Sequence, residues 1–147
     1  MAKIHVLVGS VTGKSLASAQ AIATVFNEHQ HDAVVFDAPS IEQFEGDADV
    51  LLIVTSSTGQ GDLPPSMANL FHQLKAQKPL ITDKQFAVVA LGDRGFATFC
   101  QAGDTMEAIM IELQGQSLCD RLNIDAIEHF NPVDVSREWA LNCLQFL

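Results

Sequence analysis

Short apolar runs alternate with polar segments along this chain. Four of the runs are rich in β-branched residues and predict strands at residues 4–8, 33–36, 50–54 and 86–91. Because nearly every position in them is apolar, we expect strands that are covered on both faces, as in a parallel sheet. The interval 117–127 is less regular, but Leu118, Leu122 and Ile124 allow a fifth strand.

Between these runs the apolar residues recur at helical spacing. The stripes comprise Leu16, Ala19, Ile22, Ala23 and Phe26; Met67, Leu70, Phe71 and Leu74; Met106, Ile109, Met110 and Leu113; and Trp139, Cys143, Leu144 and Leu147. Strands that alternate with helices predict a doubly wound α/β sandwich. In that architecture ligands bind beyond the carboxyl ends of the strands, where the strand order reverses.

Length and composition narrow the class of protein. A chain of 147 residues with 48% hydrophobic content can build a single core, so we expect one domain over residues 1–147. Eight Lys and Arg residues against eighteen Asp and Glu residues give a net charge of −10, which disfavours nucleic acid and anionic membranes and favours basic proteins as partners. Three cysteines and no signal peptide predict a cytoplasmic protein with free thiols.

The loop after the first predicted strand reads VGSVTGKS and ends like a nucleotide-binding P-loop. That motif needs four residues between its glycines, whereas Gly9 and Gly13 enclose three. The hydroxyls of Ser10, Thr12 and Ser15 at the start of a helix suit a single phosphate group, although such a turn can also be an ordinary helix cap. Lys14 either adds charge to that site or is simply solvated.

Two further loops of unusual composition leave the carboxyl ends of predicted strands. The second runs from Ser56 to Pro65, and its two close glycines, Gly59 and Gly61, indicate either a ligand contact or an ordinary turn. The third runs from Leu91 to Cys100 and places Phe96 among glycines. That ring either stacks on a planar ligand or packs locally.

Together the three loops resemble those of the flavodoxin family. The family's phosphate motif, Ser/Thr-x-Thr-Gly-x-Ser/Thr, matches residues 10–15, and the second and third loops resemble its Ser-Thr-x-Gly-x-Gly-Asp and Leu-Gly-Asp-Ser-x-Tyr-x-x-Phe-Cys segments. The resemblance covers essentially the whole chain and is to the short form. It implies a flavodoxin-like three-layer sandwich, a five-stranded parallel sheet in the order 2-1-3-4-5 with helices on both faces.

The resemblance also implies an FMN site and assigns its residues. The implied set is Ser10, Val11, Thr12, Gly13, Lys14 and Ser15 for the phosphate; Ser56, Ser57, Thr58 and Gly59 for one face and the N5 edge of the flavin; and Leu91, Gly92, Asp93, Phe96, Phe99 and Cys100 for the other face. At the position of Thr58, relatives often carry an aromatic residue or His. At the position of Phe96, they usually carry Tyr. Loss of one stacked ring weakens binding by about 1 kcal/mol.

By this resemblance the chain is a low-potential one-electron carrier, and a monomer, without catalytic residues of its own. Its partners are then an NAD(P)H-flavodoxin reductase as donor and an iron–sulfur or other metalloenzyme as acceptor. An FMN-dependent NAD(P)H:quinone oxidoreductase is the alternative. We expect no metal site, since His29 and His31 fit a surface helix end. Cys119 and Cys143 are interpreted as packing residues.

Overall fold

The computed structural model describes residues 1–57, 61–92, 100–125 and 131–147. Its strands are β1 (Lys3–Gly9), β2 (Asp32–Phe36), β3 (Val50–Ser56), β4 (Gln85–Gly92), β5 (Gln116–Ser117) and β6 (Leu122–Asp125). Its helices are α1 (Lys14–Glu28), α2 (Ile41–Glu45), α3 (Pro65–Gln77), α4 (Gln101–Glu112) and α5 (Pro132–Cys143), followed by a 3₁₀ turn, η1 (Leu144–Phe146).

All the strand pairs are parallel, and the sheet order is β2-β1-β3-β4-β5, with β6 also pairing with β4. The predicted order 2-1-3-4-5 is therefore confirmed. The chain moves from β1 to β2 in one direction and then to β3 on the other side of β1. The order thus reverses at β1 and β3, which places the expected ligand edge at the carboxyl ends of these two strands.

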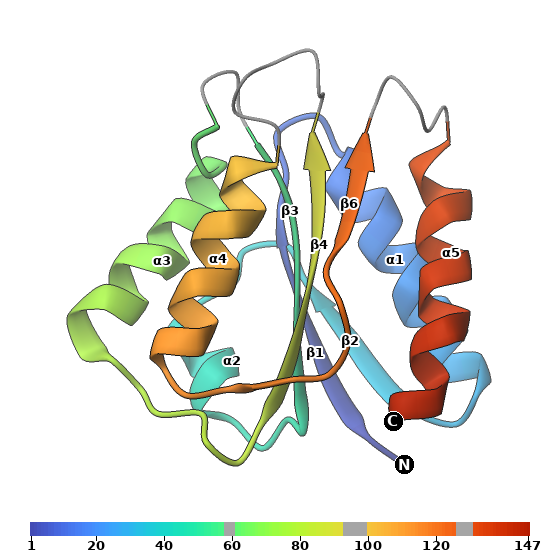
Figure 1. Ribbon diagram of the computed structural model, residues 1–147, viewed down its shortest axis with the longest axis horizontal. Helices are drawn as coiled ribbons and strands as arrows, with labels where there is room; N and C mark the ends of the chain where they lie inside the picture. The colour runs from blue at the N-terminus through green and yellow to red at the C-terminus, as the bar shows by residue number, and fades with distance from the viewer. Residues whose placement is uncertain (58–60, 93–99, 126–130) are drawn as a thin grey trace.

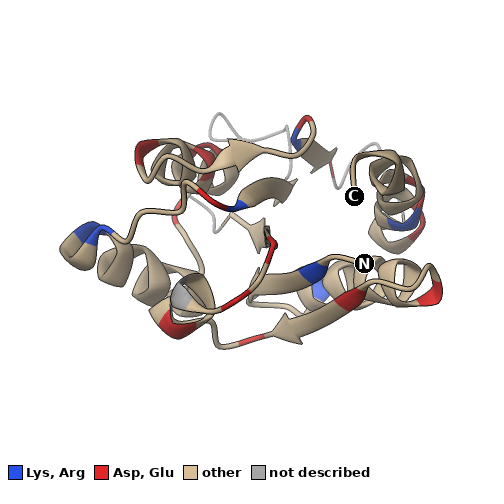
Figure 2. Cartoon of the chain, turned by 90° about the horizontal axis from the view of Figure 1, so that it is seen from below, with Lys and Arg blue, Asp and Glu red and all other residues tan. Residues whose placement is uncertain are grey.

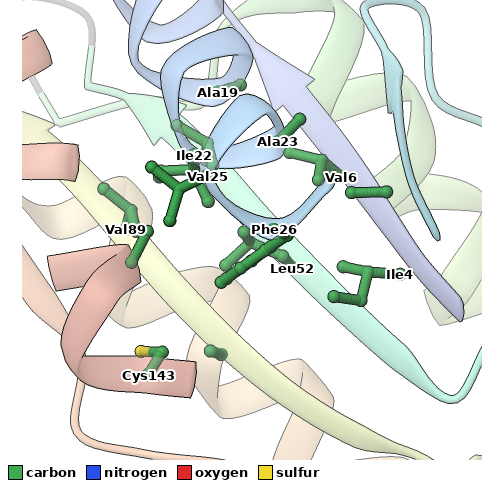
Figure 3. Close-up of a cluster of buried hydrophobic side chains, with 14 of the residues drawn as sticks. Ile4, Val6, Ala19, Ile22, Ala23, Val25, Phe26, Leu52, Val89 and Cys143 are labelled. Atoms are coloured by element: carbon green, nitrogen blue, oxygen red, sulfur yellow. The ribbon is translucent and has the colours of Figure 1, made fainter. Parts of the chain in front are cut away.

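Helices cover both faces of the sheet and divide the core in two. Helices α1 and α5 lie on one face and α3 and α4 on the other (Figure 1). Figure 3 shows the first cluster, where Ile22 and Phe26 of α1 pack on Val6 and Leu52 of the sheet. The odd-numbered neighbours of these strand residues, such as Leu51, face the second cluster. Burial on both faces explains why the strands read as continuous apolar runs.

The second cluster contains the methionines of the predicted helical stripes. Met67 of α3 and Met106 and Met110 of α4 are all fully buried, in agreement with their interpretation as core residues. Their flexible, unbranched side chains fill the space between the sheet and the two helices. The stripes at 67–74 and 106–113 are thus confirmed as buried helix faces.

The structure differs from the sequence prediction at the C-terminal strand and at one short helix. The predicted fifth strand is two pieces, β5 and β6, separated by residues 118–121. Helix α2 was not predicted, because five residues are too few to show an apolar stripe. Its start carries a recognisable signal: the Ser40 backbone N–H donates to Gln43 Oε1 at 2.6 Å, one half of a capping box.

The last helix begins earlier than its apolar stripe suggested. Asn131 accepts a hydrogen bond from the Val133 backbone N–H at 3.1 Å and caps α5, and Pro132 occupies the first turn. The buried face of this helix includes the small residues Ser136 and Ala140. Small side chains leave a weaker hydrophobic signal, so the stripe could be read only near the helix end.

Candidate functional site

The three predicted loops leave the sheet at one edge. Strands β1, β3 and β4 are parallel neighbours, so their carboxyl ends lie together at the top of Figure 1. The Ser57 backbone N–H donates to the carbonyl of Leu91 at 3.1 Å, which joins the second loop to the third. The structure therefore places residues 10–15 together with Ser56, Ser57, Leu91, Gly92 and Cys100 at one edge of the sheet. That they form one binding site stays a prediction.

The first loop makes a tight turn into α1. Gly13 adopts φ +88°, a conformation that suits glycine, and its N–H donates to Ser10 Oγ at 2.8 Å. The Ala17 N–H then bonds to the Gly13 carbonyl at 3.0 Å and starts the helix. No side chain caps this helix, and its first turn holds no acidic residue. Its remaining N–H groups and the positive end of its dipole therefore favour an anion.

The Ser15 hydroxyl bears on whether this helix N-terminus fits an anion. Its side chain is fully buried, and its Oγ atom has no hydrogen-bond partner. A buried hydroxyl without a partner costs free energy, so native structures rarely leave one. Ser18, one turn further along α1, shares both properties. Of the two, Ser15 lies in the first turn of the helix, beside the turn that Ser10 and Gly13 form.

Residues 11–14 of the first loop are exposed, and Ser10 is half-buried. Val11, Thr12 and Lys14 all face solvent, and Val11 is 64% exposed although it is apolar. This exposure is consistent with a solvated Lys14, one of the two alternatives. Whether Lys14 contacts a bound phosphate stays a prediction.

Gly9 has a role that its place in the motif did not reveal. An added Cβ atom would lie 2.6 Å from Met67 Cβ and 2.8 Å from Thr55 Oγ1, far inside van der Waals contact. Only glycine lets α3 pack this closely on the end of β1. Gly9 therefore fixes the position from which the first loop departs.

Ser57 and Cys100 connect the second loop to helix α4. Ser57 Oγ accepts a hydrogen bond from the Ala102 N–H at 3.1 Å, so this serine caps a helix 45 residues away. Cys100 precedes α4 with φ +54° and is 1% exposed, and its Sγ donates to the Ala90 carbonyl at 3.6 Å. Burial raises the pKa of the Cys100 thiol to about 11, so it is protonated at neutral pH.

Several predicted residues lie outside the described part of the chain. They are Thr58, Gly59, Asp93, Phe96 and Phe99. Their contacts with a flavin ring therefore stay predictions. His29 is an exposed residue at the end of α1, as expected. The described residues contain no group of three or more His, Cys, Asp or Glu side chains that could hold a metal ion.

Two residues around β6, Arg121 and Asp125, belong to none of the three loop motifs. Arg121 is 19% exposed and pairs with Asp104 Oδ1 at 2.6 Å, which ties the segment before β6 to the first turn of α4. Asp125 ends β6 beside Gly92 and is buried at the same edge. No local pattern marks Arg121, because its partners lie on α4, more than a dozen residues away in the sequence.

Comparisons with known proteins agree with this arrangement. The flavodoxin family model matches residues 6–138. Flavodoxin YqcA of Escherichia coli (strain K12) is 35% identical to this chain over 141 residues, and the alignment covers 95% of each protein. Protein MioC of the same strain is 27% identical over 139 residues, which are 95% of this chain and 94% of MioC. Among solved structures, a cysteine-to-alanine mutant of a flavodoxin from Pseudomonas aeruginosa matches with a TM-score of 0.90 at 26% identity, and the match covers 99% of this chain and 98% of that one. The chain therefore belongs to the flavodoxin family, whose members bind FMN.

Proposed function

We propose that this chain holds FMN at the carboxyl edge of its sheet and carries single electrons between protein partners. The observation that carries the proposal is the buried Ser15 hydroxyl, which lacks a partner at the uncapped N-terminus of α1. A terminal phosphate would accept that O–H and the free N–H groups of the first turn. The membership of the family supports the same ligand.

The residues of the first loop fit a phosphate better than a bare helix cap. Ser10 Oγ already accepts the Gly13 N–H and so holds the turn in shape before any ligand binds. The surrounding groups are hydroxyls and backbone amides, with no carboxylate in the first turn to repel an anion. FMN bound there supplies the one-electron chemistry that amino-acid side chains lack.

The proposed protein carries electrons and turns over no substrate of its own. The described side chains around the site include the serines, Thr12, Lys14, Leu91, the carboxyl of Asp125 and the Cys100 thiol, which burial keeps protonated at neutral pH. General acid–base catalysis calls for a group whose pKa lies near the working pH. These side chains are suited to binding and to excluding water. An FMN-dependent quinone reductase would instead turn over quinone with NAD(P)H alone.

The net charge supports basic protein partners. Acidic residues recur over the helices and connecting segments seen in Figure 2, and the chain carries a net charge of −10. Complementary charge raises association rates, which suits a carrier that docks briefly. We propose an NAD(P)H-dependent flavin reductase as donor and an iron–sulfur or other metalloenzyme as acceptor, with the protein acting as a one-domain monomer in the cytoplasm. No helix in the described ranges is long and apolar enough to cross a membrane.

The decisive binding experiment compares Ser15→Ala with Ser18→Ala. FMN is titrated into the FMN-free protein, and the quenching of flavin fluorescence gives the dissociation constant. We expect Ser15→Ala to weaken binding by about tenfold, the effect of one hydrogen bond to a charged group. Ser18→Ala removes an equally buried and equally unpartnered hydroxyl one turn away and should change the constant by less than about threefold. Equal affinities for all three proteins would contradict the phosphate assignment.

Electron carriage is tested separately. The FMN-loaded protein is reduced by an NADPH-dependent flavin reductase in a stopped-flow instrument, and the rate is measured at increasing salt. The rate should fall as salt screens the acidic surface. A rate independent of salt would refute the proposal that charge guides the partners together. Steady oxidation of NADPH by quinone without added reductase would favour the enzyme instead.

A further inference from the structure

Two cysteines outside the FMN site have their sulfur atoms in contact. Cys119 Sγ lies 3.1 Å from Cys143 Sγ, although the residues are 24 positions apart in the sequence. Cys143 is on the last turn of α5 and is 2% exposed within the first core cluster (Figure 3). Cys119 lies between β5 and β6 and is partly buried against the same cluster. Both were interpreted as packing residues, and both do pack, but each also faces the other.

The contact is held by hydrogen bonds on the Cys119 side. Ser117 Oγ donates to the Cys119 carbonyl at 3.2 Å, and the Leu118 N–H donates to the Phe86 carbonyl at 2.8 Å. Trp139, one turn before Cys143 on α5, donates its indole N–H to the Asp120 carbonyl at 3.4 Å. The segment that carries Cys119 is thereby attached both to the sheet and to α5. The sulfur–sulfur contact is therefore a feature of the tertiary structure, because hydrogen bonds hold the segment that carries Cys119 in place.

Access from solvent distinguishes the two thiols. Cys119 lines a groove of about 450 Å³ together with Ser117, Asp120, Arg121 and Asn123, whereas Cys143 does not. Cys119 is partly exposed and Cys143 is 2% exposed, so Cys119 is the thiol that an oxidant from solvent meets first. The contact with Cys143 also lowers the pKa of Cys119, while the same contact and burial raise the pKa of Cys143. Burial and then the charge of Asp120 act in the opposite direction and weaken the lowering of the Cys119 pKa.

We propose that Cys119 and Cys143 form a reversible dithiol site that reacts with hydroperoxides. The Cys119 thiolate attacks one oxygen of the peroxide, the O–O bond breaks, and Cys119 becomes a sulfenic acid while the other oxygen leaves as water or an alcohol. The Cys143 thiol then attacks the Cys119 sulfur, an S–S bond forms, and water leaves. The two sulfurs lose two electrons in total, and the peroxide gains them. A dithiol reductant then cleaves the S–S bond by thiol–disulfide exchange, which restores both cysteine thiols and leaves the reductant as its own disulfide.

The disulfide would tie the β5–β6 segment to the end of α5. It closes a loop between residues 119 and 143, which restricts the unfolded chain and stabilises the folded one. For a chain of this size we expect oxidation to raise the melting temperature by about 5–10 °C. The site lies away from the predicted FMN loops, so this inference does not depend on the proposed function.

The test uses the full-length, FMN-loaded protein, reduced and then freed of reductant. One portion is treated with equimolar hydrogen peroxide, remaining thiols are blocked with iodoacetamide, and unreduced peptides are mapped by mass spectrometry. We expect a linked pair of peptides containing Cys119 and Cys143, with a mass lower by two hydrogen atoms, and loss of the link after treatment with dithiothreitol. Melting curves of the two forms give the temperature shift.

Two variants keep the result interpretable. Cys143→Ala removes the resolving thiol, so Cys119 should accumulate as a sulfenic acid trapped by dimedone, and peroxide should leave the melting temperature unchanged. Cys100→Ala keeps the pair and should give the same linked peptides as the unmodified chain. The proposal is overturned if peroxide leaves both thiols free, links Cys119 to a second molecule, or oxidises Cys119 to the sulfinic acid while Cys143 stays reduced.

Discussion

Replacing Gly9 with alanine tests whether the start of the phosphate loop is fixed by helix packing. The new methyl group would lie 2.6 Å from Met67 Cβ and 2.8 Å from Thr55 Oγ1. Met67 Cβ is attached to the helix backbone, so no change of rotamer removes the clash. Carbon atoms normally pack at about 3.5–4 Å, so α3 must move away from β1 by the better part of an ångström.

The expected cost follows from what is known of overpacked cores. One extra methyl group in a well-packed interior costs about 1–3 kcal/mol. Met67 and Thr55 are both fully buried, so the strain cannot be released into solvent. We therefore expect Gly9→Ala to lower the free energy of unfolding by about 1–3 kcal/mol, equivalent to roughly 2–12 °C in melting temperature. FMN affinity should also fall, because Ser10 follows directly.

The assay is urea unfolding of the FMN-free protein followed by circular dichroism, so that ligand binding does not contribute to stability. Gly46→Ala is the matched control, because a Cβ there would meet only ordinary contacts, with nearest atoms at 3.5 Å, and Gly46 has a negative φ of −73°. Gly46→Ala should change stability by less than about 0.5 kcal/mol. If Gly9→Ala were as stable as that control, the close approach of α3 would not constrain this position.

Two further predictions concern buried ionisable groups. Lys84 is 7% exposed, and its Nζ donates to the carbonyls of Gly46 and Ala48, each at 2.8 Å. Lys84→Met should therefore lower the free energy of unfolding, measured in urea, by about 1–3 kcal/mol. Lys78 is exposed, and Lys78→Met should leave that free energy unchanged. The Cys100 pKa is raised from 9.0 to about 11, so the folded state keeps this proton longer than the unfolded state. Its contribution to stability should fall between pH 9 and 11. Measured at pH 8 and pH 10.5, the stability advantage of the unmodified protein over Cys100→Ala should decrease; an unchanged difference would argue against a buried, protonated thiol.

Much of the fold could be read from local sequence because burial leaves a periodic signal. The strands at residues 4–8, 33–36, 50–54 and 86–91 fall within β1 to β4, since a parallel sheet covered on both faces requires apolar residues at nearly every position. The helices were located by apolar stripes. The prediction was wrong where that signal is weak: α2 has only five residues, and residues 118–121 break the last strand into two.

The candidate site was predictable where its chemistry is local. The turn from Ser10 to Ser15 is a contiguous motif, and the structure confirms its place at the start of α1. Two features could not be predicted, because their partners are distant in the sequence. Ser57 caps a helix that begins more than forty residues later, and Arg121 reaches back to the first turn of that helix.

The sequence by itself determined the alternation of strands and helices, the phosphate-type loop and the acidic charge, since each depends on residues that are close together in the chain or on composition alone. Only the tertiary structure decided that the Ser15 hydroxyl is buried without a hydrogen-bond partner, that Gly9 lets α3 pack closely on β1, and that the sulfur atoms of Cys119 and Cys143 are in contact. These three features depend on distances between atoms of separate elements. Packing fixes those distances to within an ångström, and no local pattern of residues encodes them.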